Sequence, residues 1–219
     1  MDRIGYSDIT RDRDIRNYIQ GGNDVLGSLG YTEHYFSHAT KVAQNAGKIL
    51  KELGYEPDEI ELAKIAGFMH DIGNAINRID HAQSGAVMAF SLLQDLGMDS
   101  GRIAKIVSAI GNHDEGTGSA INAVAAALII ADKSDVRRSR VRDGADLSTD
   151  IHDRVNFAVN DAQIEVKDKK ITLKMTIDTE ICPVIEYFEI FLGRMLMCRK
   201  ACESLESSFH LVINDTDFL

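Results

Sequence analysis

The sequence predicts a mainly α-helical protein that ends in a small unit made of a β-hairpin and one long helix. Between about Thr10 and Ala158, apolar residues recur at helical spacing and glycine-containing breaks divide the chain into stretches of ordinary helix length. After about Asp161, apolar and polar residues alternate on both sides of Asp168-Lys169-Lys170, which is typical of a hairpin. We therefore expect a helical domain over residues 1–160 and a docked α+β unit over residues 161–219.

The breaks predict where the helices end. Glycine is a strong interruption of helical patterns, and it accompanies each of the breaks. The breaks lie at Gly21-Gly22, Gly54 to Pro57, Gly73 to Asp80, Gly97 to Gly101 and Gly111 to Gly118. We expect several short helices, with nearly all histidines in or beside these interruptions.

The first half of the chain places histidines at helix faces and helix ends. A helix over Thr32 to Leu50 would carry His34 and His38 on one side, four residues apart. The next helix begins near Pro57, a favourable first-turn residue, and ends in an apolar run directly before His70-Asp71.

Three further elements complete the predicted helical domain. The side chain of Asp80 is expected to cap a helix that begins at His81. A following helix carries Ile103, Ile106, Val107 and Ile110, and His113 follows the same apolar face. The segment Ala120 to Lys133 is apolar nearly all round, as expected of a central buried helix.

The C-terminal unit shows two strand patterns and one long amphipathic pattern. Ile164 and Val166 form the first strand pattern, and Ile171 to Ile177 the second. A helix from about Pro183 to Ser207 would place Phe188, Phe191, Leu192, Met195, Cys198, Cys202 and Leu205 on its inner side, and Phe209 to Ile213 could add a strand.

Composition restricts the partners and the compartment. The 219 residues include 24 Lys and Arg against 34 Asp and Glu, so the net charge of −10 repels nucleic-acid backbones and anionic membranes. Apolar stretches are shorter than a membrane span, and the first residues contain no signal-peptide core. We expect a cytoplasmic protein whose cysteines, Cys182, Cys198 and Cys202, are buried free thiols.

Four residues suggest a metal site. His38, His70, Asp71 and Asp132 combine imidazole and carboxylate groups, which suit divalent iron, manganese or zinc. Asp132 follows the apolar run Ala125 to Ala131, where a carboxylate is costly to bury unless it is paired or binds a cation. The alternative is a set of core polar groups satisfied by one another.

The order His38, His70-Asp71, Asp132 resembles the HD-domain superfamily of metal-dependent phosphohydrolases, which has an all-helical fold. The resemblance extends over roughly Tyr31 to Arg142, including Gly67-Phe68-Met69-His70-Asp71-Ile72-Gly73. His81-Ala82, Asn112-His113 and Ala131-Asp132-Lys133 are similar to motifs of a subgroup with two additional histidines and two metals. That subgroup includes a bacterial diadenosine tetraphosphate hydrolase and cyclic-dinucleotide phosphodiesterases.

The resemblance implies a ligand set for one or two divalent ions. One ion would be held by His38, His70, Asp71 and Asp132, and Asp71 would bridge to a second ion held by His81 and His113. Many relatives carry Lys where this chain has Asn74. The Gly-Tyr-Pro element and the adjacent histidine pair of the cyclic-dinucleotide group are absent from the sequence, which disfavours that substrate class.

Other polar residues are candidates for catalysis or substrate binding. Besides Asp71, Lys133 and Asp114 are candidates for catalysis, because they could assist the leaving group. His34, Arg137 and Arg138 are candidates for contacting the substrate, and arginine forks suit phosphate oxygens. For His34 a role in orienting a ligand or simple exposure stays open. The basic run Arg137 to Arg142 could equally be a solvated helix end, and His152 is expected at the surface.

The predicted function is hydrolysis of a phosphate ester or phosphoanhydride of a small molecule, with a nucleotide as the expected class, by metal-activated water. A di-iron oxygenase on the same fold is one alternative, and a nucleotide-binding regulatory module without turnover is another. No nucleic-acid polymer or membrane is expected as a partner. The C-terminal unit could cover the site or form a homodimer.

Overall fold

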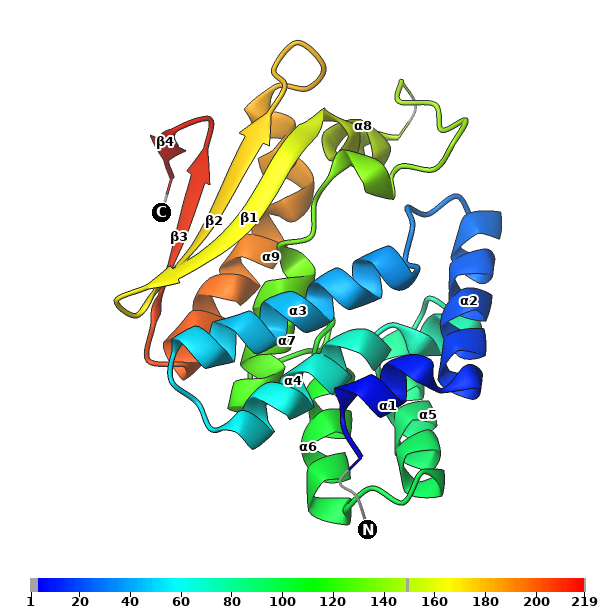
Figure 1. The fold of residues 1–219 in the computed structure, drawn as a ribbon. Helices are drawn as coiled ribbons and strands as arrows, with labels where there is room; N and C mark the ends of the chain where they lie inside the picture. The colour runs from blue at the N-terminus through cyan, green and yellow to red at the C-terminus, as the bar shows by residue number, and fades with distance from the viewer. Residues whose placement is uncertain (1–3, 149, 219) are drawn as a thin grey trace.

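A computed structural model describes residues 4–148 and 150–218 and contains a helical body beside a small sheet (Figure 1). The mainly α-helical class predicted from the sequence is confirmed. The helices of the body are α1 (Tyr6–Arg11), α2 (Arg13–Ser28), α3 (Phe36–Glu52), α4 (Pro57–Met69), α5 (His81–Asp95), α6 (Ser100–Gly111), α7 (Ala123–Lys133) and α8 (Ile151–Ala158), with 3-10 helices η1 (Ile72–Ala75) and η2 (Arg138–Arg140).

The centre of the body is α7, which α3, α4 and α6 surround. Each residue of α7 from Val124 to Ala131 is buried, as its apolar sequence predicts. Helices α3 and α4 cross at Gly67, where a β-carbon would lie 2.7 Å from the Cα of Ala43. Glycine at this position therefore allows the close approach that brings His38 of α3 beside His70 at the end of α4.

The predicted break at Gly21-Gly22 is wrong, because α2 continues through both glycines. A β-carbon on Gly22 would lie 3.2 Å from the backbone nitrogen of Ala75 in η1. The glycine thus provides space for η1 to pack against α2. It serves tertiary packing and does not end the helix, which the local sequence pattern cannot distinguish.

Two helix starts differ from the sequence prediction in detail. Helix α3 begins at Phe36, so His34 lies in the preceding segment and not on the helix. Helix α5 begins at His81 as predicted, but the Asp80 side chain makes no capping hydrogen bond. Asp80 instead has a left-handed backbone with φ of 56°, which turns the chain into the helix.

The C-terminal unit is a four-stranded sheet in the order β1 (Val159–Lys167), β2 (Lys170–Ile177), β3 (Ser208–Ile213) and β4 (Thr216–Asp217). Strands β1 and β2 form the predicted hairpin, and Asp168 and Lys169 both have positive φ as a tight two-residue turn requires. Helix α9 (Val184–Ser204) crosses from β2 to β3, which therefore pair in parallel.

Helix α9 joins the sheet to the helical body, since one face of α9 packs on β3 and another on α7 (Figure 1). Phe191, Met195 and Cys198 are buried there, whereas Leu192, predicted to face inward, is 50% exposed. All three cysteines are buried and free, as predicted. In the described ranges, no helix is long and apolar enough to cross a membrane.

Candidate metal centre

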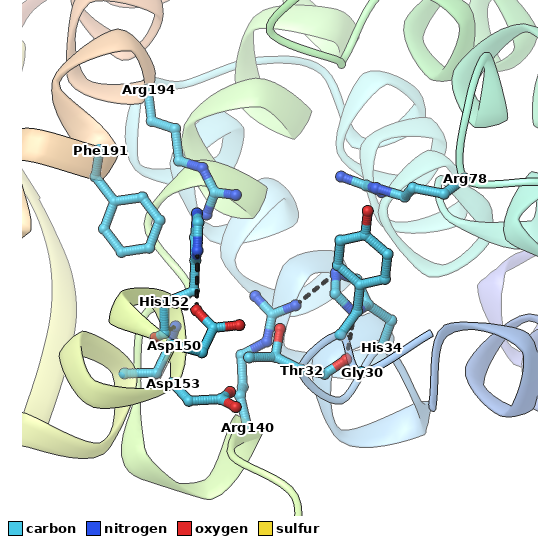
Figure 2. A pocket seen from close by; sticks show the side chains of 12 residues that line it. Gly30, Thr32, His34, Arg78, Arg140, Asp150, His152, Asp153, Phe191 and Arg194 are labelled. Atoms are coloured by element: carbon cyan, nitrogen blue, oxygen red, sulfur yellow. Dashed lines mark hydrogen bonds and ion pairs between the residues drawn. The ribbon is translucent and has the colours of Figure 1, made fainter. Parts of the chain in front are cut away.

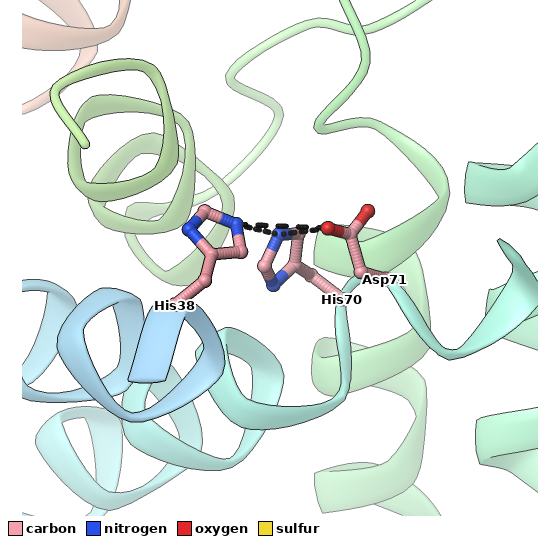
Figure 3. Close-up of side chains that lie close together, drawn as sticks. All are labelled: His38, His70 and Asp71. Carbon is pink, nitrogen blue, oxygen red and sulfur yellow. Dashed lines mark hydrogen bonds and ion pairs between the residues drawn. The ribbon is translucent and has the colours of Figure 1, made fainter. Parts of the chain in front are cut away.

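His70 and Asp71 lie where α4 ends and η1 begins. The His70 Nδ1–H donates to the carbonyl oxygen of Gly67 at 2.8 Å, so the ring satisfies a carbonyl of the last helical turn. This contact fixes the proton on Nδ1 and directs Nε2 toward Asp71 and His38 (Figure 3).

A first cluster joins three helices. The Nε2 atoms of His38 and His70 are 3.2 Å apart, and they lie 3.6 Å and 3.2 Å from Oδ2 of Asp71. Oδ1 of Asp132, on α7, lies 3.4 Å and 3.5 Å from the same two nitrogens. Two imidazoles and two carboxylates thus direct one atom each at a common point.

A second cluster faces the other oxygen of Asp71. Oδ1 of Asp71 lies 3.4 Å from Nε2 of His81 and 4.0 Å from Nε2 of His113, and these two nitrogens are 3.2 Å apart. His81 begins α5 and His113 follows the end of α6. The two oxygens of one carboxylate therefore face two different pairs of histidines.

The remaining ring nitrogens of these histidines all have acceptors. Nδ1 of His38 is 2.7 Å from Oδ2 of Asp135, and Nδ1 of His81 and His113 donate to the carbonyls of Arg78 and Ile110 at 3.1 Å and 2.6 Å. With Nδ1 held as a donor in each ring, Nε2 is the atom that points into the cluster and can ligate a metal ion in place of a proton.

This donor set fits divalent cations. Nε2 atoms that face each other across 3.2 Å beside carboxylate oxygens favour a positive charge among them, which a proton or a metal ion can supply. Each cluster contains atoms within 4.8 Å of one another that could share a metal ion, and imidazole with carboxylate suits iron, manganese and zinc.

The two clusters differ in their charge preference. Burial lowers the pKa of His70, but the carboxylates of Asp71 and Asp132 outweigh it and raise this pKa to about 10. The pKa values of these two carboxyl groups lie well below their usual range, because the positive groups beside them outweigh burial. By contrast, burial and the charges of His70 and Lys133 lower the pKa of His113 to about 3.

A chain of ion pairs connects the centre to the C-terminal unit. Nζ of Lys133, itself buried, lies 2.8 Å from Oδ2 of Asp132 and 3.3 Å from Oε2 of Glu115. The other oxygen of Glu115 accepts from Nε of Arg194 on α9 at 2.7 Å. Helix α9 therefore covers one side of the site.

A pocket of about 190 Å³ lies beside the clusters (Figure 2). Arg78, Arg140 and Arg194 line it, and the same three arginines also line the small cavity at Asp71, His81 and His113. Guanidinium groups that surround a space next to a metal centre suit the oxygens of a phosphate group.

The predicted substrate residues occupy different places. His34 lines the pocket, donates from Nδ1 to the Thr32 carbonyl at 2.8 Å, and accepts at Nε2 from Arg140 at 2.9 Å. Arg137 and Arg138 do not line it. Arg137 donates to Asp135 at 2.8 Å, and Arg138 to the Phe157 carbonyl at 2.6 Å.

Of the two residues predicted to assist catalysis, Lys133 lines the cavity at the clusters, whereas Asp114 does not. The Asp114 carboxylate accepts from the backbone nitrogen of Gly116 at 3.3 Å, within its own turn.

Sequence reasoning missed Arg78, Asp135 and Arg194. Asp135 could have been predicted, because a ligating histidine such as His38 needs an acceptor for its second ring nitrogen and Asp135 lies one turn after Asp132. Arg78 lies in the break just before His81, where a positive residue was a weak signal. Arg194 lies about 60 residues after Lys133 in the sequence, and the packing of α9 on α7 brings it to the site.

Comparison with known proteins supports the resemblance noted in the sequence. Residues 35–137 match the family model of the HD domain. An uncharacterized protein of Methanocaldococcus jannaschii is 26% identical over 159 residues, which are 63% of this chain and 61% of that protein. Ribonuclease Y of Dehalococcoides mccartyi is 42% identical over 71 residues, 29% of this chain and 13% of the ribonuclease.

Among solved structures, a predicted HD superfamily hydrolase from an uncultured Thermotogales bacterium matches with 27% identity and a TM-score of 0.45. The match covers 57% of this chain and 68% of that one. The chain spans less than two thirds of the length of the first curated relatives it matches. The match to the family model supports an HD domain over residues 35–137, and the subgroup with two metals stays a prediction.

Proposed function

We propose that the protein is a metal-dependent phosphohydrolase that cleaves a phosphate ester or phosphoanhydride of a small molecule, with a nucleotide as the expected class. The position of Asp71 carries this proposal, because its two oxygens face two separate pairs of imidazole nitrogens. Two divalent cations, iron or manganese in the first instance, would supply charge neutralisation and a water activated near neutral pH.

The residues that would hold the cations are divided between the clusters. His38, His70 and Asp132 with Oδ2 of Asp71 would hold the first cation. His81 and His113 with Oδ1 of Asp71 would hold the second.

The chain's own cations would bind and orient the phosphate. Arg140 is buried, and its guanidinium donates to neutral acceptors only, the carbonyls of Glu33 and Asp135 and the ring of His34. Within the described part of the chain, no carboxylate lies within 4.0 Å of it, so its charge is available to an anion. Arg78 and Arg194 provide further donors, and Lys133 lies beside Asp132 to balance charge on the departing oxygen.

The enclosure of the pocket favours a small substrate. Residues of α8 and α9, and Tyr31 and Thr32 before α3, form its walls, so the space beside the centre is bounded on several sides (Figure 2). The net charge of −10 also disfavours long contact with a polyanion.

A second candidate is hydrolysis of RNA phosphodiesters. The similarity to ribonuclease Y proteins favours it, including one of Acetivibrio thermocellus that is 31% identical over 122 residues. In this case the pocket would take a strand end, and the flanking nucleotides would lie outside it.

The test is a substrate screen with defined metals. Metal-free protein is supplied with Mn²⁺, Fe²⁺ or Zn²⁺ and given mononucleotides, dinucleoside polyphosphates, phosphomonoesters and an RNA oligonucleotide, with and without oxygen. We expect metal-dependent phosphate release from a small substrate without oxygen. Turnover of RNA alone supports the second candidate, a requirement for oxygen and iron indicates an oxygenase, and binding without turnover indicates a regulatory module.

A further inference from the structure

The pocket beside the metal centre has two chemically different ends. Arg78, Arg140 and Arg194 lie at the end next to the clusters. Asp150 and Asp153, from the start of α8, line the pocket but not the cavity at Asp71. A ligand that fills this pocket would therefore meet positive donors at one end and carboxylate acceptors at the other.

Asp153 is the unusual member of this wall. The residue is only 8% exposed, yet its carboxylate makes no hydrogen bond or ion pair with any described residue. Asp150 differs, because its side chain accepts from the backbone nitrogen of His152 at 2.7 Å and caps α8. The carboxylate oxygens of Asp153 are not among the described atoms that are fully buried without a partner, so they are open to the pocket. Burial and the neighbouring Asp150 raise the pKa of Asp153 and outweigh His152 and Arg142, which lower it.

The residues around Asp153 form their hydrogen bonds with other groups. Arg154, the next residue, donates to Glu186 at 2.8 Å, and Arg142 donates to the carbonyls of Tyr31 and Asn23, so neither arginine bonds Asp153. The side chain of Asn156, one turn later in α8, bonds the His152 carbonyl and the Arg137 backbone nitrogen. The neighbours of Asp153 are thus satisfied, and its acceptor capacity is left for what enters the pocket.

We propose that Asp153 is a specificity-determining residue that accepts a hydrogen bond from an N–H or O–H group at the non-phosphate end of the substrate. For a nucleotide, the two sources of this donor are a ribose hydroxyl and an amino group of the base. The inference rests on the proposed function for the phosphate end, but it concerns a contact that contributes to binding without taking part in the bond cleavage.

The experiment compares the protein with its Asp153→Leu variant, which replaces the carboxylate by a branched apolar group that cannot accept a hydrogen bond. Asp143→Asn is the control, since Asp143 is an exposed carboxylate in the preceding loop. The probes are adenosine 5′-monophosphate, its 2′-deoxy analogue, purine riboside 5′-monophosphate, which lacks the exocyclic amine, and p-nitrophenyl phosphate, which lacks both donors. Binding is measured by calorimetry with Mn²⁺, and KM and kcat wherever turnover occurs.

We expect Asp153→Leu to weaken binding of adenosine 5′-monophosphate at least about tenfold, with little change in kcat and none in the KM for p-nitrophenyl phosphate. The analogue that lacks the contacted donor should bind the original protein about as weakly as it binds the variant, which identifies the donor.

Equal nucleotide affinity in the two proteins, absence of nucleotide binding to the original protein, or an equal loss with p-nitrophenyl phosphate would each overturn the proposal. Nucleotide binding that depends on Asp153 but leads to no phosphate release with any metal would instead overturn the hydrolytic function and leave this contact standing.

Discussion

The two halves of the metal centre share Asp71 but are built differently. His38 and Asp132 project from within α3 and α7, and the ring of His38 is held by the buried carboxylate of Asp135. His81 and His113 lie at helix ends, where their Nδ1 atoms donate to backbone carbonyls of adjacent turns and Arg78 contacts Nε2 of His81 at 3.2 Å. The first half is therefore more rigid and more negative than the second.

The electrostatic environment of the two halves follows the same division. The carboxylates of Asp71 and Asp132 raise the pKa of His70 to about 10, so the first half stabilises positive charge. Arg78 lies 4.0 Å from the Asp71 oxygen of the second half and adds a positive charge there. We infer that the first half binds its cation more tightly and that the second fills at higher metal concentration.

The largest effect is expected for Asp71, which belongs to both halves. Asp71→Ala should abolish high-affinity metal binding and hydrolysis, because each half loses a carboxylate ligand. Metal content is measured after equilibrium dialysis, and circular dichroism checks the fold. Asp143→Asn serves as the control. Retention of both cations by the variant would show that the carboxylate does not join the halves.

The next effect separates the halves from each other. His38→Ala should remove the tight cation, whereas His81→Ala should retain one tight cation and lose the weaker one. Calorimetric titration of each metal-free variant with Mn²⁺ measures the two steps. If both variants lost the same step, the division into two halves would be wrong.

A smaller effect is expected for the residue that orients His38. Asp135→Asn keeps the shape but weakens the acceptor for the ring N–H, so affinity for the tight cation should fall about 10- to 100-fold. The second binding step should not change. An unaltered first step would mean that the backbone alone positions the His38 ring.

The smallest effect is expected for Asn74, which stands where many relatives carry lysine. Its Nδ2 donates to Oδ1 of Asp71 at 2.9 Å and to the Asp71 carbonyl at 3.0 Å. Asn74→Ala should weaken the second cation about fivefold, the value of one hydrogen bond, and leave the first unchanged. A weaker first step in the same titration would contradict this assignment.

The sequence was sufficient to predict which residues gather around Asp71, because local patterns mark His70-Asp71 and Asp132, and the family resemblance indicated His38, His81 and His113. His70-Asp71 ends an apolar helix, and Asp132 follows an apolar run, so their burial could be inferred from neighbouring residues. The helix boundaries at Pro57 and His81 and the hairpin turn at Asp168-Lys169 were predicted for the same reason. Local patterns of this kind depend only on backbone geometry and burial.

The substrate pocket could not be predicted in the same way. Arg78 and Asp153 lie in a loop and on the short helix α8, and Arg194 comes from a helix that also packs on a sheet. Their meeting depends on how α8 and α9 pack, which no local pattern encodes. The basic run pointed to Arg137 and Arg138, but pairing with Asp135 and with Phe157 directs both away from the pocket.

The most direct test of the shared carboxylate is anomalous X-ray scattering from crystals of the Mn²⁺-loaded protein. The account predicts two peaks on either side of Asp71, one ligated by Nε2 of His38 and His70 and the other by Nε2 of His81 and His113, at the separation of about 3.5–4 Å usual for two-metal sites. A metal bound away from Asp71, or ligated without these histidines, would contradict it.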